Sequence, residues 1–312
     1  MKLISVVTAC FNEENNIYNI YEEVRKNLTQ LKHYQYEHIF IDNSSTDNTV
    51  KLLKHIAQTD KNIKIIKNSR NFGWLRSPYH GILQAKGDAI ISISADLQDP
   101  PELILEFIKR WEKGFKIVAG IKERSDEFFI LFYIRKLYYK LIKQLNDGEI
   151  ICNYTGFGLY DKSIINILKT FNDVNPFFRG MISEIGFDVA KVSYRQPKRK
   201  SGKSRLKLYR LYDVAILGIV NHSKLPLRLV TFLGLSLSSV SLLIVLIHIF
   251  LKIFLWKNTY FNFSSLLIGS FLFFSFQILL MGILGEYILA IHTQVLNRPL
   301  VIESERTNFV EN

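Results

Sequence analysis

Short apolar runs alternate with amphipathic stretches along the first third of the chain. The strand-length apolar runs are residues 3–10, 37–42, 63–68 and 88–94, and the stretches with helical spacing are residues 16–28, 50–58 and 79–87. Periodicity of these two kinds indicates strands and helices respectively. Strands that alternate with helices predict βαβ units and a parallel, doubly wound sheet covered on both faces. We therefore expect an α/β domain in the N-terminal part of the chain.

Acidic and amide side chains follow three of the predicted strands, in the stretches "FNEEN", "IDNSSTD" and "SADLQD". Ligands of such sheets bind at the carboxyl ends of the strands, which meet at one edge. The same residue types also form ordinary turns and helix caps, and Asp96 and Asp99 fit caps of a helix that begins near Pro100. The sequence has no glycine-rich phosphate loop, so diphosphate binding would depend on a divalent cation held by one or two oxygen ligands.

Two long apolar segments, residues 227–255 and 266–290, lie in the last third of the chain. Each exceeds the roughly 20 apolar residues that cross a bilayer as a helix. Basic residues are concentrated before the first segment, in residues 195–228, and are sparse in the turn between the segments. The positive-inside rule therefore predicts a multi-pass protein of the cell (inner or plasma) membrane, with both ends and the N-terminal domain in the cytoplasm.

The net charge of +12 bears on the possible binding partners, and the two cysteines, Cys10 and Cys152, bear on the cellular compartment. Two cysteines are too few for a disulfide framework, which fits a reducing compartment. The basic run before the first apolar segment favours attraction to anionic lipid headgroups, with interfacial helices over residues 209–229. A solvated face is the plainer explanation. No nucleic-acid recognition module accompanies the run, so we expect no nucleic-acid partner.

Seven motifs in order resemble one family across almost the whole chain. They are "FNEE", "IDNSSTDNT", "SRNFGW", "KGDAIISISADLQDPPE", "FFRGMISEIGF", "RKSGKSR" and "LGEYILAIHTQVLNRP". Together they resemble the polyprenyl-phosphate glycosyltransferases of glycosyltransferase family 2, which include dolichyl-phosphate mannose synthases and bactoprenol glucosyltransferases. The resemblance implies a GT-A (Rossmann-like) fold, a nucleotide-sugar donor, Mg²⁺ or Mn²⁺, a polyprenyl phosphate acceptor and inversion at the anomeric carbon.

The resemblance also assigns residues to roles. The nucleotide-sugar site would comprise Ala9, Phe11, Glu13, Asp42, Ser94 and Asp96, and the metal ligands would be Asp96 and Gln98. The catalytic groups would be Asp96, Arg124 and Arg179. The acceptor-phosphate site would comprise Arg124, Arg135, Lys136, Arg199, Ser204 and Arg205, although a solvated-surface role fits Arg135 and Lys136 equally well.

The chain departs from the family pattern at several of these positions. Ser94 replaces the first carboxylate of the D-x-D motif, and Asn43 replaces a common second Asp. Gly156 and Gly158 stand where the family has an Asp and an Arg, and Ala9 stands where it has proline. These changes leave open a catalytically degenerate membrane scaffold. A processive polysaccharide synthase is disfavoured because its Q-x-x-R-W signature is absent.

The sequence therefore predicts four regions. They are a catalytic GT-A domain (1–205), juxtamembrane interfacial helices (206–226), two transmembrane helices (227–290) and a cytoplasmic tail (291–312). The expected activity is inverting transfer of one sugar, from UDP-glucose or a related UDP-sugar, to undecaprenyl phosphate. A GDP-mannose-dependent mannosyltransferase is the alternative. The expected partners are the donor, the lipid acceptor and the bilayer, with homo-oligomers through the membrane helices as an option.

Overall fold

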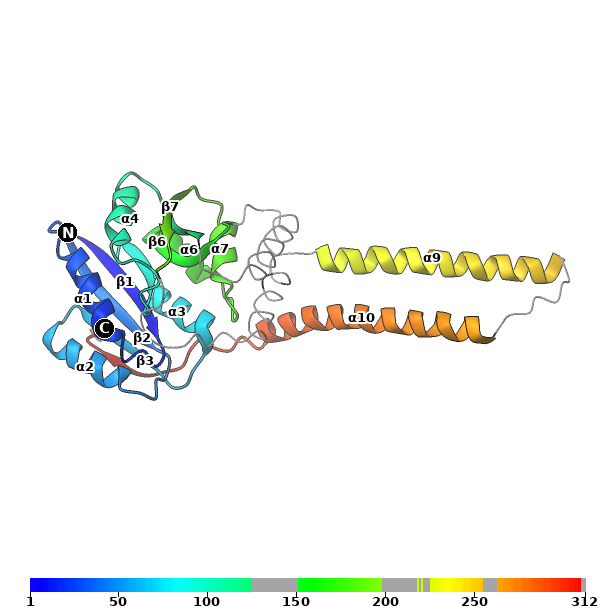
Figure 1. Ribbon diagram of the computed structural model, residues 1–312, viewed down its shortest axis with the longest axis horizontal. Helices are drawn as coiled ribbons and strands as arrows, with labels where there is room; N and C mark the ends of the chain where they lie inside the picture. The colour runs from blue at the N-terminus through cyan, green and yellow to red at the C-terminus, as the bar shows by residue number, and fades with distance from the viewer. Residues whose placement is uncertain (125–150, 198–217, 219, 221–224, 255–262, 310–312) are drawn as a thin grey trace. The chain divides into compact units, whose positions relative to one another are not determined.

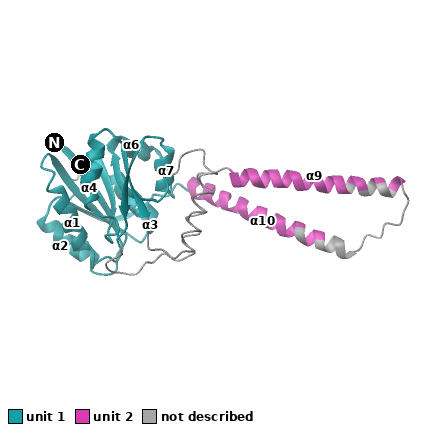
Figure 2. Cartoon of the chain, turned by 45° about the horizontal axis from the view of Figure 1, so that its top comes forward, with its two compact units in different colours: residues 1–211, 296–312 teal, residues 212–295 magenta. Residues whose placement is uncertain are grey.

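The computed structural model describes residues 1–124, 151–197, 218, 220, 225–254 and 263–309. The chain divides into two compact units (Figure 2). Unit 1 combines Met1–Leu211 with Leu296–Asn312, and unit 2 is Tyr212–Val295. The C-terminal segment after the second apolar helix thus belongs to the same unit as the N-terminal strands.

Unit 1 contains an eight-stranded mixed sheet with the order β7-β5-β6-β4-β1-β2-β3-β8 (Figure 1). The strands are β1 (Lys2–Cys10), β2 (Tyr34–Asp42), β3 (Ile63–Asn68), β4 (Ala89–Ser94), β5 (Ile117–Arg124), β6 (Tyr154–Asp161), β7 (Val189–Arg195) and β8 (Glu303–Thr307). Strands β4, β1, β2 and β3 are parallel to one another, whereas β6 runs antiparallel to β4 and β5, and β8 antiparallel to β3. The predicted α/β domain is confirmed, and the antiparallel strands are additions that the apolar pattern did not indicate.

Helices cover both faces of the sheet. One hydrophobic core lies under α1 (Ile17–Leu28), α2 (Thr49–Thr59) and α4 (Leu103–Glu112). The second lies under α3 (Gly73–Gln84), α6 (Lys162–Thr170) and α7 (Phe178–Glu184). The central strands are buried on both sides because each parallel strand is sandwiched between these helix layers, which is why they appear in the sequence as nearly continuous apolar runs.

Helix α3 begins six residues before the predicted helix over residues 79–87. Pro78 lies inside α3, although proline normally costs a helix one backbone hydrogen bond. The predicted stop at Gly87 was also wrong, because α3 ends at Gln84. Gly87 instead allows close packing: a Cβ there would lie 2.5 Å from the Ser5 hydroxyl oxygen.

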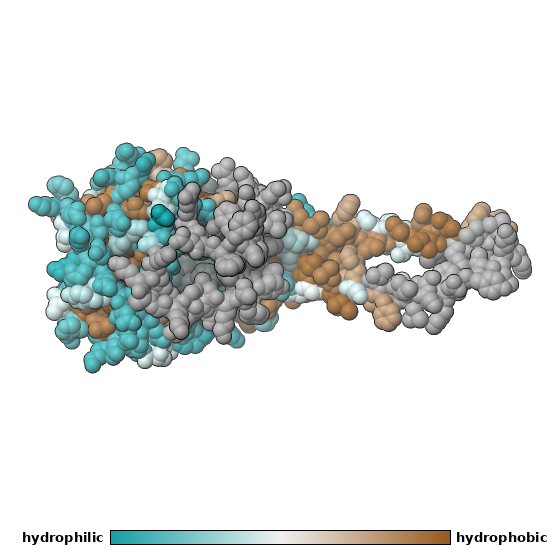
Figure 3. All heavy atoms as spheres, in the orientation of Figure 1, coloured by the Kyte–Doolittle hydropathy of each residue, from teal (hydrophilic) through white to brown (hydrophobic). Residues whose placement is uncertain are grey.

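Unit 2 consists of two long apolar helices, α9 (Leu225–Phe254) and α10 (Phe263–Val295), which contact each other. Within them, Leu225–Ile244 and Gly269–Val295 are long and apolar enough to cross a membrane, and neither segment is buried inside the protein. Figure 3 shows apolar surface over these helices. An uncovered apolar surface of this size is typical of a membrane-spanning or interaction segment.

Strand β8 attaches the C-terminal segment to the edge of the sheet beside α3. Its residues pair with β3, so β3 has no free edge along this stretch. The Glu303 carboxylate lies 2.6 Å from the His80 ring nitrogen Nε2, and Arg306 donates to Gln84 Oε1 at 2.8 Å. Arg76 donates to the carbonyl of Pro299 at 3.0 Å. Three α3 side chains spaced four residues apart, on one face of the helix, therefore hold this tail.

Ending the chain after Pro299 should destabilise unit 1. The truncation removes strand pairing with β3, the buried Val301 side chain and the ion pair of Glu303. We expect a loss of roughly 2–4 kcal/mol in the free energy of unfolding, and aggregation through the exposed edge of β3. Denaturant unfolding of the full chain in detergent provides the measurement, with Glu102→Gln, at an exposed carboxylate, as a neutral control. A truncated chain as stable as the full one would contradict this role for β8.

Candidate active site

The ends of three strands meet at one edge of the sheet because β1 is paired on both sides. Ala9 lies opposite Ser94 of β4, and Cys10 lies opposite Asp42 of β2. This register places the "FNEEN", "IDNSSTD" and "SADLQD" stretches at the same edge. It follows directly from parallel pairing, in which the carboxyl ends of neighbouring strands point the same way.

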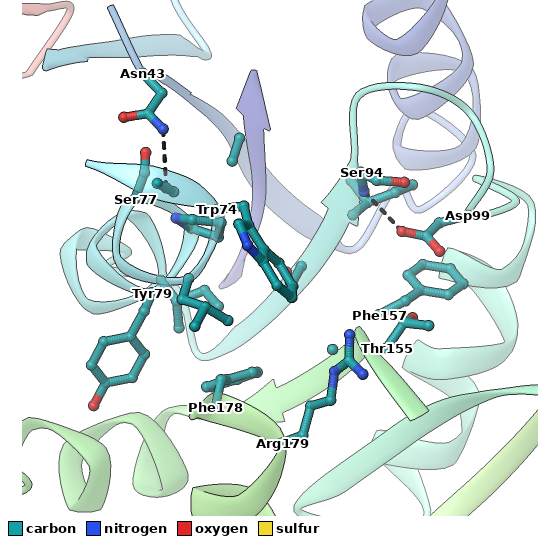
Figure 4. A pocket seen from close by; sticks show the side chains of 18 of the residues that line it. Asn43, Trp74, Ser77, Tyr79, Ser94, Asp99, Thr155, Phe157, Phe178 and Arg179 are labelled. Atoms are coloured by element: carbon teal, nitrogen blue, oxygen red, sulfur yellow. Dashed lines mark hydrogen bonds between the residues drawn. The ribbon is translucent and has the colours of Figure 1, made fainter. Parts of the chain in front are cut away.

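A cavity of about 280 Å³ opens at this edge (Figure 4). Its walls come mainly from the end of β1 with Phe11, the start of α3, the end of β4, β6 and the start of α7, and they include Asn43 and Asp99. Ligand pockets range upward from roughly 300 Å³. The enclosed part of the site therefore accommodates one small group, such as a monosaccharide, rather than a whole nucleotide sugar.

Four of the predicted site residues line this cavity together: the donor-site residues Ala9, Phe11 and Ser94 and the catalytic candidate Arg179. Ser94 has an enclosed hydroxyl oxygen with no hydrogen-bond partner among the described residues. An unpaired buried hydroxyl is costly unless a ligand or water satisfies it. The arrangement thus offers a hydrogen-bonding position at the end of β4.

Arg179 contributes a cation to the cavity that is unpaired within the described residues. Its side chain points from the start of α7 towards Thr155 (Figure 4). Its guanidinium has no hydrogen bond or ion pair with any residue in the described part of the chain, although it is half-buried. Arginine in this state is suited to a phosphate or another anion, because its planar fork matches two oxygens.

Two other predicted donor contacts lie beside the cavity. Asp42 is fully buried, accepts a hydrogen bond from the backbone N–H of Ser45 at 3.0 Å, and has a pKa raised by that burial. Glu13 lies in the loop after β1, where its carboxylate accepts from the Asn16 amide at 2.6 Å. Their contact with a nucleoside stays a prediction.

Asp96 and Gln98 lie in a tight turn directly after β4. Leu97, between them, has a φ of 59°, which is the left-handed conformation. The turn is closed by a hydrogen bond from the Gln98 N–H to Asp96 Oδ1 at 3.2 Å, and both side chains are half-exposed. One carboxylate and one amide are thereby brought to the mouth of the sheet.

Asp99 is a brace for the end of β4 and does not cap α4. The N-cap of α4 is Glu102, and it makes no side-chain capping bond. The Asp99 carboxylate is buried and accepts hydrogen bonds from the Ser94 N–H at 3.0 Å and the Tyr194 hydroxyl at 3.1 Å. Burial raises the pKa of Asp99. Tyr194 belongs to β7. The helix-cap pattern in the sequence is local, so it could not predict this long-range contact.

Asn43, which the sequence offered only as a replacement for an Asp, organises the approach to α3. Its Oδ1 accepts from the Phe72 N–H at 2.9 Å and the Asn68 amide at 3.0 Å. Its Nδ2 donates to Asn71 Oδ1 at 3.1 Å and to the Gly73 carbonyl at 3.0 Å. An aspartate lacks the two N–H groups that make the latter bonds, so the amide is the better brace here.

The two glycines in β6 have structural causes. A Cβ at Gly158 would lie 2.4 Å from the Val118 carbonyl oxygen, so no side chain fits at the position where the family carries an Arg. Gly156 has a φ of 99°, which disfavours any other residue. The local backbone therefore leaves no room for a side chain at position 158 and disfavours one at position 156.

The remaining predicted residues fall at or beyond the limit of the described chain. Arg124 is the last residue of β5, and its backbone lies opposite Arg195 of β7. The acceptor-phosphate candidates Arg135, Lys136, Arg199, Ser204 and Arg205 all lie outside the described residues.

Comparison with known proteins identifies the family. Residues 5–168 match the sequence profile described as glycosyl transferase family 2. The chain belongs to glycosyltransferase family 2. It is 33% identical over 299 residues to the glycosyltransferase YkcC of Bacillus subtilis strain 168, covering 96% of this chain and 92% of that one. It is 32% identical over 308 residues to the SfII prophage-derived bactoprenol glucosyl transferase of Shigella flexneri, covering 98% and 99% of the two chains.

The fold resembles solved structures of the same architecture. Glucosyl-3-phosphoglycerate synthase from Mycobacterium tuberculosis, crystallised with Mn²⁺, UDP and phosphoglyceric acid, superposes with a TM-score of 0.50. The match has 17% sequence identity and covers 70% of this chain and 76% of that one. The predicted GT-A fold of this glycosyltransferase is thereby confirmed.

Removing the Asp99 carboxylate should destabilise the glycosyltransferase unit. In Asp99→Ala the Ser94 N–H and the Tyr194 hydroxyl lose their partner, which costs about 1–3 kcal/mol in the free energy of unfolding. Asp99→Asn should cost less, since an amide still accepts from Ser94 and donates to the tyrosine oxygen. Urea unfolding is the measurement, and Asp188→Ala, at an exposed carboxylate, is the control. Equal stability of Asp99→Ala and wild type would refute the bracing role.

Proposed function

We propose that this glycosyltransferase transfers a single sugar, with inversion, from UDP-glucose or a related UDP-sugar to polyprenyl phosphate at the cytoplasmic face of the cell membrane. The observation that carries the proposal is a monosaccharide-sized cavity lined by Arg179, which has no ion-pair partner among the described residues, in a chain that also contains two apolar helices long enough to span a membrane. Similarity to bactoprenol glucosyl transferases over nearly the full length supports the lipid acceptor. Undecaprenyl phosphate is the first acceptor to test.

The donor would lie along the edge formed by β1, β2 and β4. The nucleoside would meet Phe11, Glu13 and Asp42, and the sugar would enter the cavity between α3 and α7. The diphosphate would then pass the turn that carries Asp96 and Gln98. This order follows the line of strand ends from β2 to β4, along which ligands of open α/β sheets bind.

The residues of that turn fit a divalent cation that binds together with the donor. Within the described residues no cluster of three or more acidic, histidine or cysteine side chains could hold a metal alone. Mg²⁺ often uses only one or two protein carboxylates, with substrate phosphates and water completing the shell. Asp96 and Gln98 would supply the protein ligands. Mg²⁺ or Mn²⁺ there would neutralise charge on the leaving diphosphate.

The chemistry needs little help from a general base. A phosphomonoester has a second pKa near 6, so the acceptor is largely dianionic at neutral pH. One of its oxygens would form a bond to the anomeric carbon while the bond from that carbon to the diphosphate oxygen breaks. The protein would contribute positioning of the two substrates and the positive charge of Arg179. Gly156, where the family carries an Asp sometimes proposed as a base, is therefore compatible with activity.

Chain connectivity supports the proposed topology. The chain leaves unit 1 before α9 and returns to unit 1 after α10. If α9 and α10 both span the bilayer, the N-terminal end of α9 and the C-terminal end of α10 face the same compartment. The basic residues before α9 predict that this compartment is the cytoplasm. A cytoplasmic active site would then meet both the soluble donor and the phosphate of a lipid embedded in the same leaflet.

A transfer assay distinguishes this proposal from its alternatives. The full-length protein in detergent should be incubated with undecaprenyl phosphate and UDP-glucose, UDP-galactose or GDP-mannose, and the lipid products should be analysed by mass spectrometry. We expect a mass increase of one hexose with UDP-glucose. A product only with GDP-mannose would favour a mannosyltransferase. The absence of product with every donor would favour the degenerate scaffold.

Asp96 should be essential for metal-dependent turnover. Asp96→Ala and Asp96→Asn should each lower kcat by about a hundredfold or more, because charge stabilisation of the diphosphate is worth several kcal/mol. Ser94→Ala should lower it less than about tenfold, since a neutral hydrogen bond contributes roughly 0.5–1.5 kcal/mol. Turnover is measured against Mg²⁺ and Mn²⁺ concentration. Near-normal metal-dependent activity in Asp96→Ala, with activity abolished in Ser94→Ala, would show that these roles are wrong.

Arg179 should act through its charge at the reacting phosphates. Arg179→Ala should reduce kcat/KM by about a hundredfold, the scale of removing one group that stabilises transition-state charge. Arg179→Lys should restore part of the loss, because lysine keeps the charge but not the planar fork. Arg25→Ala, on the exposed side of α1, should leave kcat/KM unchanged. Wild-type kinetics in Arg179→Ala would exclude this role.

A further inference from the structure

Trp74 presents a partly exposed indole to the cavity. It lies in the first turn of α3, lines the cavity and is 40% exposed. Within the described part of the chain it has no ring–ring contact, cation–ring contact or hydrogen bond. Figure 4 shows the indole extending into the space between Ser94 and Arg179. A large aromatic face left open inside a concave site is suited to a ligand that covers it.

The indole is held in place by the turn that precedes it. Asn43 uses both its amide oxygen and its amide nitrogen on residues 68–73, and Asn71 Oδ1 accepts from the Gly73 N–H at 2.8 Å. Gly73 has a φ of 88°, a conformation that glycine adopts without strain. The backbone that carries Trp74 is therefore fixed before any ligand arrives, which reduces the ordering cost of binding.

The other groups around the cavity limit what can cover the indole. Phe178 adds a second aromatic side chain, and Ser94 and Thr155 add hydroxyls. The Asp99 carboxylate has each oxygen engaged, by Ser94 and Tyr194, so Arg179 is the available charge. The matching ligand is a small uncharged group with an apolar face and a hydroxyl-bearing edge, attached to an anionic phosphate that Arg179 can meet.

A hexosyl group in its pyranose form has these properties. Its C–H bonds are weakly positive and lie on the faces of the ring, where they suit the negative face of an indole. Its equatorial hydroxyls point outward towards hydrogen-bonding side chains. An axial hydroxyl on the stacked face would instead press an oxygen against the indole and lose its bond to water.

We propose that Trp74 is the stacking platform for the hexosyl group of the donor and selects sugars whose stacked face carries no axial hydroxyl. This inference rests on the proposed function and adds a residue that determines donor specificity. Glucose carries no axial hydroxyl on either ring face, whereas galactose and mannose carry one on the same face, at C4 and C2 respectively, so Trp74 discriminates against these two sugars only when it covers that face.

The test compares binding of UDP, UDP-glucose and UDP-galactose to the full-length protein in detergent by calorimetry. Trp74→Ala should weaken UDP-glucose binding about three- to tenfold, the scale of one aromatic contact, and leave UDP binding unchanged. A preference for UDP-glucose over UDP-galactose that shrinks in Trp74→Ala would place the indole on the ring face that carries the axial C4 hydroxyl of galactose. Trp74→Phe should retain most of the UDP-glucose affinity. Phe187→Ala, at an aromatic side chain with similar exposure (43%) outside the cavity lining, is the matched control and should change neither UDP nor UDP-glucose binding.

Tryptophan fluorescence gives a second readout independent of turnover. UDP-glucose should change the emission of wild type more than UDP does, and Trp74→Phe should abolish that difference. Equal weakening of UDP and UDP-glucose in Trp74→Ala would place the indole on the nucleoside and overturn the inference. Unchanged binding of both would also overturn it, while transfer activity in the wild type would leave the proposed function standing. A wild type that binds and transfers no nucleotide sugar would overturn both.

Discussion

The pairing of β1 with β2 on one side and β4 on the other is the constraint on which the site depends. Parallel strands in register end at the same edge, so Ala9, Asp42 and Ser94 are brought together by backbone hydrogen bonds alone. The buried apolar side chains of β1, including Ile4 and Val6, anchor that register between the two helix layers. A shift by one residue would exchange the side chains that β1 presents to the two cores and disrupt the packing of both, so the same burial that stabilises the sheet also fixes the geometry of the site.

Two buried polar side chains fix the loops that adjoin these strands. Asn43 fixes the turn before α3, and Asp99 joins the end of β4 to Tyr194 of β7. Each satisfies backbone or hydroxyl groups that would otherwise be buried without a partner. Asn43 replaces a common acid of the family and Asp99 is a retained one, yet both act here as braces. Losses of charge at Asn43 and Gly158 therefore reflect local packing and do not by themselves indicate a degenerate enzyme.

The apolar pattern predicted the four parallel strands well, because residues sandwiched between two helix layers must be apolar throughout. It failed for α3, which begins six residues before the predicted helix, and for β8, whose sequence "ESERT" is polar because it lies at an exposed sheet edge. The acidic strand ends were visible in the sequence. The role of Asp99 was not, because its partner Tyr194 is 95 residues away. Trp74 gave no signal by itself, since an aromatic residue at a helix start is usually part of the core.

Helix α3 contacts both the cavity and the C-terminal segment, whose proximity the sequence did not predict. Its first turn carries Trp74 into the cavity, while Arg76, His80 and Gln84 on another face bind the segment that follows α10. The tail therefore restrains the helix that forms one wall of the proposed sugar site. Because α10 continues directly into this tail, the segment that contains α9 and α10 is joined covalently to unit 1 at both of its ends. The contact between His80 and Glu303 lies outside the cavity lining, but it holds the helix that carries Trp74. The geometry of the site therefore depends on the C-terminal strand as well as on the strands that line the cavity.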